Sequence, residues 1–206
     1  MTSGPQQIVL ATHNLHKVAE FQAIVATVRP DLQVLAYDGP EPVEDGVSFA
    51  ENALIKARAA AAHTGLPALA DDSGICVDVL GGSPGIFSAY WAGHAKDASA
   101  NLALLLDQLS DIADPHRTAQ FRSTIALVIP GPDGAVDERV VEGVWPGRLA
   151  HEAAGGGGFG YDPIFIPDGQ DAAAESTVAE WTTEAKNEAS HRARAFVALA
   201  AHLEGL

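Results

Sequence analysis

The chain has 206 residues, of which 47% are hydrophobic, and its formal net charge is −15 at pH 7. This length predicts a single domain over residues 1–206, and the acidic balance argues against general binding to nucleic acids or anionic membranes, which requires basic surface. No apolar run approaches the roughly 20 residues of a membrane span and the N-terminal residues lack a signal-peptide pattern, so we expect a cytoplasmic protein without a membrane partner.

Apolar periodicity and turn residues predict an α/β domain with a mixed sheet. The predicted elements, in chain order, are a strand over 7–12, a helix over 13–28, a strand over 32–37, a helix over 48–65, strands over 66–71 and 74–80, a helix over 97–109, an antiparallel hairpin over 117–147 and a closing helix over 190–203. Asn14 is the expected cap of the first helix. Ser48 with Glu51 fits a capping box, and Gly65 fits a helix stop.

The segment THNLHK, residues 12–17, forms the predicted turn between the first strand and the first helix. Free N–H groups at a helix N-terminus attract anions, and Lys17 adds a positive charge there. A cation in the first turn opposes the helix dipole and destabilises the helix unless an anion lies nearby. The segment therefore either binds phosphate or is a capped turn with a solvent-facing lysine.

Two adjacent acids, Asp71 and Asp72, lie at the end of the strand predicted over 66–71 and precede a predicted Ser-Gly turn. A strand-end carboxylate suits Mg²⁺, which prefers carboxylate oxygens and commonly bridges to substrate phosphates. Glu44 and Asp45 could supply a further acid. The alternative is that the side chain of Asp71 or Asp72 forms an Asx turn. The sequence pattern alone does not decide between a metal site and this turn.

The glycine-rich stretch over 155–163 allows a ligand to approach the backbone closely. Phe159 and Tyr161 offer flat surfaces on which a base could stack, and Asp162 offers an acceptor for a base edge. The simpler interpretation is a flexible loop whose aromatic side chains are buried in the core.

A cationic segment over 186–192 contains Lys186, His191 and Arg192 at a predicted helix start. These donors suit phosphate or carbonyl oxygens, although charged helix ends are common. Lysine is scarce in this chain, and Lys17, Lys56 and Lys186 lie inside or beside the candidate segments. Lys56 is on the helix predicted over 48–65, four residues after Asn52, so both point to one face. That placement, in so acidic a chain, favours a local pocket for an anion.

Five motifs resemble the inosine triphosphate pyrophosphatase family, also called the Ham1-like family, and occur in the family's order. They are ATHNLHK, SFAENALIKA, ADDSG with DVLGGSPGIFSA, GGFGYDPIF and KNEASHR. The resemblance runs from about residue 8 to residue 203. It implies hydrolysis of deaminated purine nucleoside triphosphates (ITP, dITP and XTP) to the monophosphate and pyrophosphate, which cleanses the nucleotide pool. It further implies Mg²⁺, a homodimer, and an elongated two-lobed α/β fold with helices flanking a mixed sheet and the active cleft between the lobes.

The resemblance also implies roles for individual residues. Asp72 would be the general base and a Mg²⁺ ligand, with Glu44 as the second ligand. The triphosphate would be bound by Thr12, His13, Asn14, Leu15, His16 and Lys17. Further substrate contacts would come from Lys56, Ser73, Phe159, Gly160, Tyr161, Asp162, Lys186, His191 and Arg192. Phe159 would stack on the base.

This chain departs from the family's pattern at two positions. Tyr90 stands where the family commonly has arginine, which puts any phosphate or structural contact of that arginine in doubt. Ala193 stands where the family often has glycine, and because alanine is a better helix former we expect little consequence.

Two other functions compete with this interpretation. A Maf-like pyrophosphatase would act on other nucleotides, but the FGYDP and SHR segments argue against it. A catalytically silent nucleotide-binding protein would not need Asp72, Glu44 and Lys17 together.

Overall fold

The computed structural model describes residues 6–171 and 173–203, and the side chain of His16 lies outside this description. The chain divides into two compact units. Unit 1 consists of the described residues up to Asp72, then 124–142, then the residues from 195 on; unit 2 consists of 73–123 and 143–194. Among the described residues, no helix is long and apolar enough to cross a membrane.

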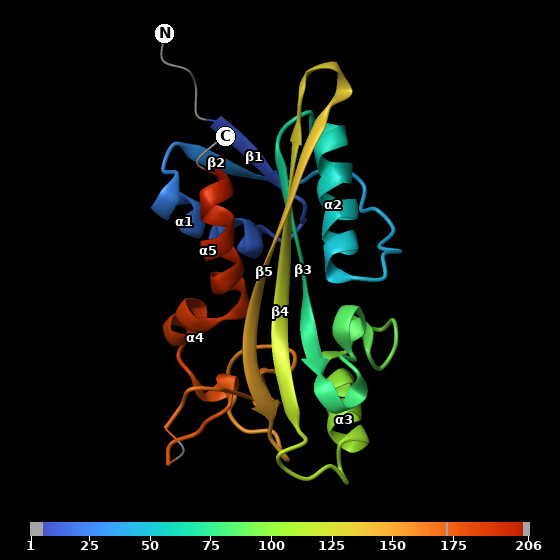
Figure 1. The fold of residues 1–206 in the computed structure, drawn as a ribbon, viewed down its shortest axis with the longest axis vertical. Helices are drawn as coiled ribbons and strands as arrows, with labels where there is room; N and C mark the ends of the chain where they lie inside the picture. Colours follow the sequence, from blue (N-terminus) through green and yellow to red (C-terminus); the bar gives the residue numbers. More distant parts are fainter. Residues whose placement is uncertain (1–5, 172, 204–206) are drawn as a thin grey trace. The chain divides into compact units, whose positions relative to one another are not determined.

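A mixed six-stranded sheet, with strand order β2-β1-β3-β4-β5-β6, forms the framework of the chain (Figure 1). Its first three strands are parallel, with Ile8 opposite Val34 and Val9 opposite Ala68, whereas β6 is antiparallel to β5. The strands are β1 (Gln6–Leu10), β2 (Leu32–Ala36), β3 (Ala68–Val77), β4 (Thr118–Pro130), β5 (Val136–Leu149) and β6 (Phe165–Pro167). The predicted mixed α/β fold is thus confirmed.

Helices flank the sheet, as expected. They are α1 (Leu15–Val28), α2 (Phe49–Thr64), α3 (Ala98–Gln108), α4 (Thr183–Ala189) and α5 (His191–Leu203). The sequence did not predict α4, nor a 3₁₀ turn over Gly85–Tyr90. Both are short, with seven and six residues, so their apolar periodicity extends over two turns at most.

One strand prediction was wrong. We expected two strands separated by a turn at the acid pair, but β3 is continuous over Ala68–Val77, so Asp71 and Asp72 lie inside it. Carboxylates in a strand interior need compensation, and lysines supply it: Lys17 lies 3.1 Å from Asp71 and Lys56 lies 3.2 Å from Asp72.

Unit 1 is a three-layer arrangement whose two cores follow from the alternation of side chains along β1. Ile8 and Leu10 face a cluster with Phe21 of α1 and Phe196 of α5, whose rings meet edge to face at 4.3 Å. Val9 faces the opposite layer, where α2 presents the alanines Ala53, Ala57, Ala60 and Ala61. In Figure 1, α1 and α5 accordingly lie on one side of these strands and α2 on the other.

Helix α2 is bounded as the sequence predicts. The Ser48 hydroxyl accepts from the Glu51 amide, and Gly65 ends the helix with a φ of 70°. The reciprocal bond of the capping box is shifted by one residue, because the Glu51 carboxylate accepts from the Val47 amide at 2.6 Å. The amides of Glu51 and Val47 at the helix start therefore both have a hydrogen-bond acceptor.

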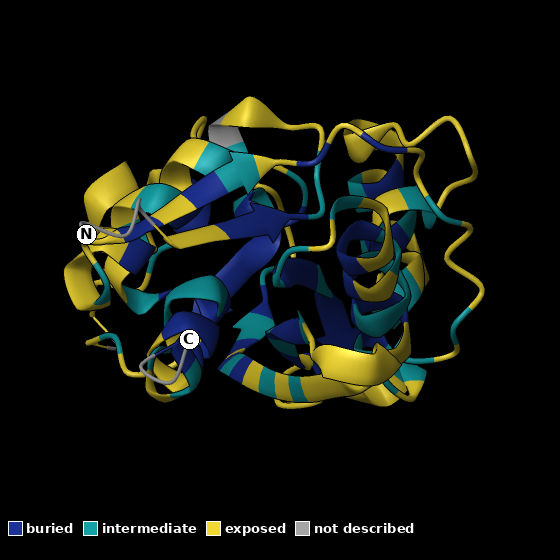
Figure 2. Ribbon diagram, turned by 90° about the horizontal axis from the view of Figure 1, so that it is seen from above, coloured by how far each residue is buried: buried dark blue, intermediate teal, exposed yellow. Residues whose placement is uncertain are grey.

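Unit 2 has an aromatic core. Trp145 and Phe165 meet edge to face at 5.6 Å, and Phe121 contacts Phe165 at 4.7 Å. The core cluster also holds Ile75, Leu105, Leu109, Leu149, Tyr161 and Ile164. Figure 2 shows how burial is distributed, with dark-blue buried residues along the strands and yellow exposed residues on the outer faces of the helices.

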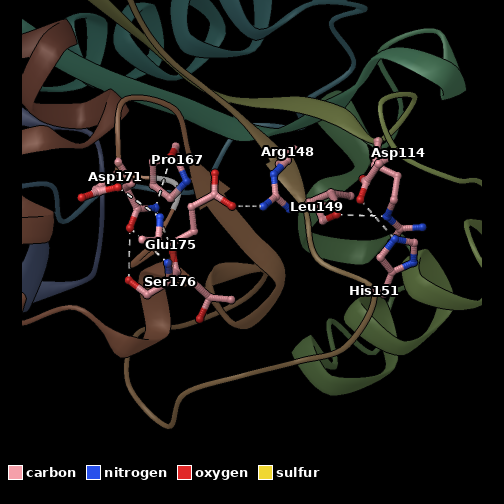
Figure 3. Close-up of polar contacts among 12 residues, drawn as sticks. Asp114, Arg148, Leu149, His151, Pro167, Asp171, Glu175 and Ser176 are labelled. Carbon is pink, nitrogen blue, oxygen red and sulfur yellow. Dashed lines mark hydrogen bonds and ion pairs between the residues drawn. The ribbon is translucent and has the colours of Figure 1, made fainter.

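Arg117 is a fully buried cation in unit 2, with 1% of its surface exposed. Its guanidinium donates to the carbonyl oxygens of Leu109, Ile112, Leu149 and Ala150. Burial lowers the pKa of Arg117, although the charge of Asp114 opposes this effect. These bonds fasten the loop before β4 to the end of β5, where the Leu149 carbonyl and the neighbouring Arg148–Glu175 ion pair are visible (Figure 3).

Candidate active site

The segment from Thr12 to Lys17 is a capped helix start in unit 1. The Thr12 hydroxyl accepts from the Asn14 amide at 3.2 Å, and the Asn14 side chain accepts from the Lys17 amide at 3.4 Å. Leu15 is 70% exposed. The predicted cap is therefore present, and the segment lies at the surface of the unit.

The anion required near Lys17 is supplied by the protein itself. The Lys17 ammonium donates to Asp71 Oδ1 at 3.1 Å, and the Asp71 side chain is only 6% exposed, against 34% for Lys17. An unpaired carboxylate at that depth would be costly. The ion pair with Asp71 explains how a lysine is tolerated in the first turn of α1. It also keeps the Lys17 ammonium beside the segment that caps the helix.

His13 connects the same segment to the loop before α2. Its Nε2 lies 3.0 Å from the Gly39 carbonyl oxygen, and its Nδ1 lies 3.2 Å from Glu41 Oε1. The imidazole also stacks on Tyr37, with centroids 5.8 Å apart. His13 thus contacts the loop that carries Glu44.

Lys56 lies between two carboxylates of unit 1. Its ammonium lies 3.0 Å from Glu44 Oε2 and 3.2 Å from Asp72 Oδ1, and its side chain is 16% exposed. Burial alone lowers the pKa of Lys56, but the charges of Asp72, Glu44 and Asp71 outweigh it, so its pKa lies above the ordinary value. We call Lys17, Glu44, Lys56, Asp71 and Asp72 the carboxylate–lysine cluster.

Asp72 is the member of this cluster best suited to chemistry. Burial raises its pKa, and Lys56 opposes that rise through its charge and a hydrogen bond. Asp72 Oδ1 is bonded to Lys56, whereas Oδ2 is buried without a hydrogen-bond partner. An orphaned carboxylate oxygen of this kind is free to bind a cation or accept a proton.

The acids of the cluster fit a divalent metal that shares its coordination with substrate. Asp72 Oδ2 lacks a partner, and the Glu44 side chain is 44% exposed. Within the described part of the chain, no group of three or more His, Cys, Asp or Glu side chains could hold a metal ion. Two carboxylates suit Mg²⁺, which commonly keeps waters and binds phosphate oxygens.

Unit 2 gathers a second set of predicted residues around Phe159, which is 61% exposed. The Lys186 ammonium lies 4.2 Å from the centroid of its ring, and the Arg192 guanidinium lies 5.3 Å from it. Asp162 Oδ2 accepts from the Phe159 amide at 2.7 Å and from Lys186 at 2.5 Å. We call Phe159, Asp162, Lys186 and Arg192 the aromatic–cation cluster.

Glycine is required at one position of this loop. Gly158 has a φ of +72°, and a Cβ there would lie 2.2 Å from Asp162 Oδ2. The carboxylate therefore occupies the space that a side chain would fill, which explains part of the glycine run.

The two aromatic residues of the loop differ in environment. Phe159 presents its ring to solvent, whereas Tyr161 is 5% exposed and belongs to the core cluster of unit 2. The Tyr161 hydroxyl donates to the Ser88 carbonyl at 2.9 Å, and burial raises the pKa of this phenol. Phe159 is thus the ring available for stacking.

The start of α5 contributes to unit 2. His191 is buried at 5% exposure and stacks on Phe121 with centroids 4.9 Å apart. Arg192 donates to the Ser73 hydroxyl at 3.3 Å. Tyr90, at the end of the 3₁₀ turn Gly85–Tyr90, stacks on His94 with ring centroids 5.2 Å apart.

The structure thus gathers Lys17, Glu44, Lys56 and Asp72 in unit 1, and Ser73, Phe159, Asp162, Lys186 and Arg192 in unit 2. The site residues predicted from the sequence did not include Asn52, which is 4% exposed and accepts from the Gly46 amide at 2.9 Å. Its side chain opposes the rise in the pKa of Asp72 that burial causes, and so favours the charged carboxylate. Its spacing of four residues from Lys56 was a signal for a shared face. Ser88 lies within the motif DVLGGSPGIFSA, but no pattern in the sequence indicated its buried hydrogen bonds.

Known proteins resemble this chain over nearly its whole length. A dITP/XTP pyrophosphatase of Leifsonia xyli subsp. xyli is 62% identical, covering 97% of this chain and 96% of the relative. One of Streptomyces coelicolor is 53% identical, covering 94% of each. These relatives are hydrolases that act on triphosphate anhydride bonds, and such pyrophosphatases generally use a divalent metal.

Solved structures agree with the sequence relatives. A HAM1 protein of Coxiella burnetii superimposes with a TM-score of 0.85 at 37% identity, covering 98% of this chain and 100% of that chain. A nucleoside-triphosphatase/dITP/XTP pyrophosphatase of Mycobacterium abscessus gives 0.78 at 46% identity, covering 94% and 98%. A sequence model of the Ham1 family matches residues 8–202. This chain therefore belongs to the Ham1 family.

Proposed function

We propose that this protein hydrolyses the deaminated purine nucleoside triphosphates dITP, ITP and XTP to the nucleoside monophosphate and pyrophosphate. The observation that carries the proposal is the buried Asp72 carboxylate, which keeps one oxygen without a hydrogen-bond partner beside Lys56 and Glu44. Family membership and the relatives named dITP/XTP pyrophosphatases support the same reaction.

Asp72 and Glu44 are the proposed ligands of a Mg²⁺ ion. When bound, the ion would neutralise negative charge on the phosphate groups of the substrate. Lys56 already offsets the negative charge of both acids. The protein therefore holds two carboxylates close together before any ligand is present.

Asp72 is the proposed general base. Its carboxylate accepts a proton from a water molecule, whose oxygen forms a bond to the α-phosphorus while the bond from that phosphorus to the bridging oxygen breaks. Pyrophosphate leaves with the bridging oxygen, and the nucleoside monophosphate retains the oxygen from water. A pKa raised by burial makes Asp72 a stronger proton acceptor than an exposed aspartate.

The start of α1 is the proposed site for the triphosphate. Its backbone N–H groups, the Thr12 hydroxyl and the Lys17 ammonium are donors suited to phosphate oxygens. The proposed contacts from this segment are Thr12, His13, Asn14, Leu15, His16 and Lys17. The hydrogen bond to Asp71 holds the Lys17 side chain near the helix start. Because this side chain is already ordered, binding of the triphosphate costs less conformational entropy.

The aromatic–cation cluster is the proposed site for the purine. Phe159 offers an exposed ring for stacking, while Lys186 and Arg192 offer donors to the 6-oxo group of hypoxanthine or xanthine. Adenine carries an amino donor at that position and would leave buried donors unpaired, which is costly. Further proposed contacts come from Lys56, Ser73, Gly160, Asp162 and His191. The predicted contact from Tyr161 is not kept, because this residue is 5% exposed and its hydroxyl donates to the Ser88 carbonyl.

The setting of the reaction is also part of the proposal. We place it in the cytoplasm, where the nucleotide pool is used, with the protein acting as a homodimer. We treat both units as one functional domain, because β3, β4 and β5 each contribute residues to both.

A substrate panel tests the proposed function. Pyrophosphate release would be measured with Mg²⁺ for dITP, ITP, XTP, ATP, GTP and dTTP, with Asp72→Asn as the control. We expect release from the first three only, and only by the wild-type protein. Release from dTTP would instead indicate the Maf-like alternative, and tight ITP binding without release would indicate a silent binding protein.

A further inference from the structure

Ser88 is a buried hydrogen-bonding centre in unit 2, outside both clusters described above. It lies in the 3₁₀ turn Gly85–Tyr90 and is 7% exposed. Its hydroxyl donates to the Gly85 carbonyl at 2.6 Å and accepts from the Ile75 amide at 2.9 Å. Its carbonyl accepts from the Tyr161 hydroxyl at 2.9 Å. One residue thus joins the turn, β3 and the loop that carries Phe159.

The contact with β3 leaves no room for a side chain at Gly74. A Cβ at this position would lie 2.4 Å from both the Gly85 carbonyl oxygen and the Ser88 hydroxyl oxygen. Gly74 follows Ser73, whose hydroxyl accepts from Arg192. The strand segment next to Ser73 is therefore fixed against the turn by close approach as well as by hydrogen bonds.

The contact with the loop is made by a side chain that does not face solvent. Tyr161 is 5% exposed, whereas Phe159, two residues earlier, is 61% exposed. Asp162 follows Tyr161 and binds both the Phe159 amide and Lys186. Fixing Tyr161 therefore also fixes the residue that orients the stacking ring and its cation.

We propose that Tyr161 and Ser88 are positioning residues for base recognition: they hold the loop over 159–162 against β3 and do not touch the nucleotide. The inference rests on the proposed function and deepens it. Discrimination between a 6-oxo and a 6-amino group depends on donors held in fixed places, because a loose donor can turn away from the wrong base. Burial raises the pKa of Tyr161, which keeps its hydroxyl protonated as a donor at neutral pH.

Two conservative variants test this role. Tyr161→Phe keeps the ring and removes only the donor, and Ser88→Ala removes a hydroxyl that cannot reach a ligand because it is buried. The matched control is Tyr37→Phe, because Tyr37 in unit 1 is also 5% exposed and donates to a backbone carbonyl, that of Pro40, at 3.0 Å. Melting temperatures would establish that each variant folds.

The measurements are the affinities for dIMP and for pyrophosphate with Mg²⁺, and the ratio of kcat/KM for dITP to that for dATP, whose base carries a 6-amino group. For Tyr161→Phe and Ser88→Ala we expect dIMP affinity to fall roughly 10-fold, as an unpaired buried group predicts, with a lower dITP preference and pyrophosphate affinity within about 2-fold. The double variant should lose less than the product of the single losses. Tyr37→Phe should leave dIMP affinity unchanged.

Three results would overturn the inference. A loss in Tyr161→Phe without any loss in Ser88→Ala would show that the Ser88 hydroxyl does not position the loop, because this variant keeps the carbonyl that accepts from Tyr161. Equal losses of dIMP and pyrophosphate affinity would indicate general loosening of the fold. Unchanged dIMP affinity and unchanged dITP preference in both variants would show that neither residue positions the loop.

Failure of the proposed function remains distinguishable from failure of this inference. If the wild-type protein releases no pyrophosphate from dITP, the proposed function fails. Amide hydrogen exchange then decides the positioning role, since the Phe159 amide is bonded to Asp162. Faster exchange at Phe159 in Tyr161→Phe, with no change in Tyr37→Phe, supports the role, and unchanged exchange contradicts it.

Discussion

Units 1 and 2 place cations beside different partners. In unit 1 the ammonium groups of Lys17 and Lys56 contact carboxylates, so each cation and acid compensates the other. In unit 2 Lys186 and Arg192 lie over an exposed aromatic ring. The first arrangement suits the charged chemistry of phosphate and metal, and the second suits a flat base with carbonyl oxygens. We therefore expect substitution of the acids in the carboxylate–lysine cluster to change turnover, and substitution of the ring in the aromatic–cation cluster to change binding.

The largest effect is expected for Asp72→Asn. Asparagine keeps the shape and can still accept from Lys56, but it cannot take a proton from water at neutral pH. We expect kcat for dITP to fall by about 10²–10⁴-fold, the range for loss of a general base, with a melting temperature close to wild type. Steady-state kinetics measure this, and near-normal turnover would remove Asp72 from the role of base.

Arg117→Met is expected to destabilise unit 2 without touching either cluster. The substitution removes the donor to buried carbonyls of Leu109 and Leu149, so we expect the free energy of unfolding to fall by about 3 kcal/mol. Urea denaturation measures it. The matched control is Arg58→Met, because the Arg58 side chain is 52% exposed; an equal loss in both variants would contradict the structural role of Arg117.

Lys56→Met tests the compensation within unit 1. It leaves the carboxylates of Glu44 and Asp72 without their shared cation, so we expect a loss of about 2 kcal/mol in unfolding free energy, below the value for a fully buried pair. Adding Asp72→Asn should restore part of it. Lys96→Met makes the same change of charge at an exposed site and should have little effect. A similar loss in Lys96→Met would indicate that net charge, not the cluster, determines stability.

Phe159→Ala should change binding more than turnover. Loss of base stacking corresponds to about 1–3 kcal/mol, so we expect KM for dITP to rise roughly 10-fold with kcat within about 2-fold of wild type. Phe87→Ala is the control, because Phe87 is another exposed aromatic residue of unit 2, at 48% exposure. An unchanged KM in Phe159→Ala would place the base elsewhere.

The smallest effect is expected for Glu138→Gln at the surface of unit 1. The hydrogen bond from Arg58 holds the pKa of Glu138 below its ordinary value. The stabilisation is present above the ordinary pKa and is lost as the pH falls through the lowered value. We expect less than about 0.5 kcal/mol at pH 7, and the wild-type and variant curves should converge in acid. A difference that grows on acidification would contradict this sign.

Local patterns predicted most of the fold, because they depend on neighbours in sequence. The caps at Asn14 and Ser48 and the hairpin turn near Gly134 required only short-range geometry. The continuity of β3 through its acid pair could not be predicted in this way. Its compensating lysines lie 54 and 16 residues away from Asp71 and Asp72, and local propensity alone disfavours aspartate in a strand.

The candidate site shows the same limit. The need for an anion beside Lys17 followed from the helix dipole, but the sequence could not show that Asp71 provides it. The sequence does not distinguish the two aromatic residues of the loop. In the structure Phe159 is exposed, whereas Tyr161 is buried against Ser88. Burial depends on contacts with a turn more than 70 residues earlier, and that information is not local.

The most direct test of the central chemistry is hydrolysis of dITP in water labelled with oxygen-18, with the products analysed by mass spectrometry. We expect the label in dIMP and not in pyrophosphate, because water activated by Asp72 attacks the α-phosphorus. Label in pyrophosphate, or release of phosphate in its place, would contradict it.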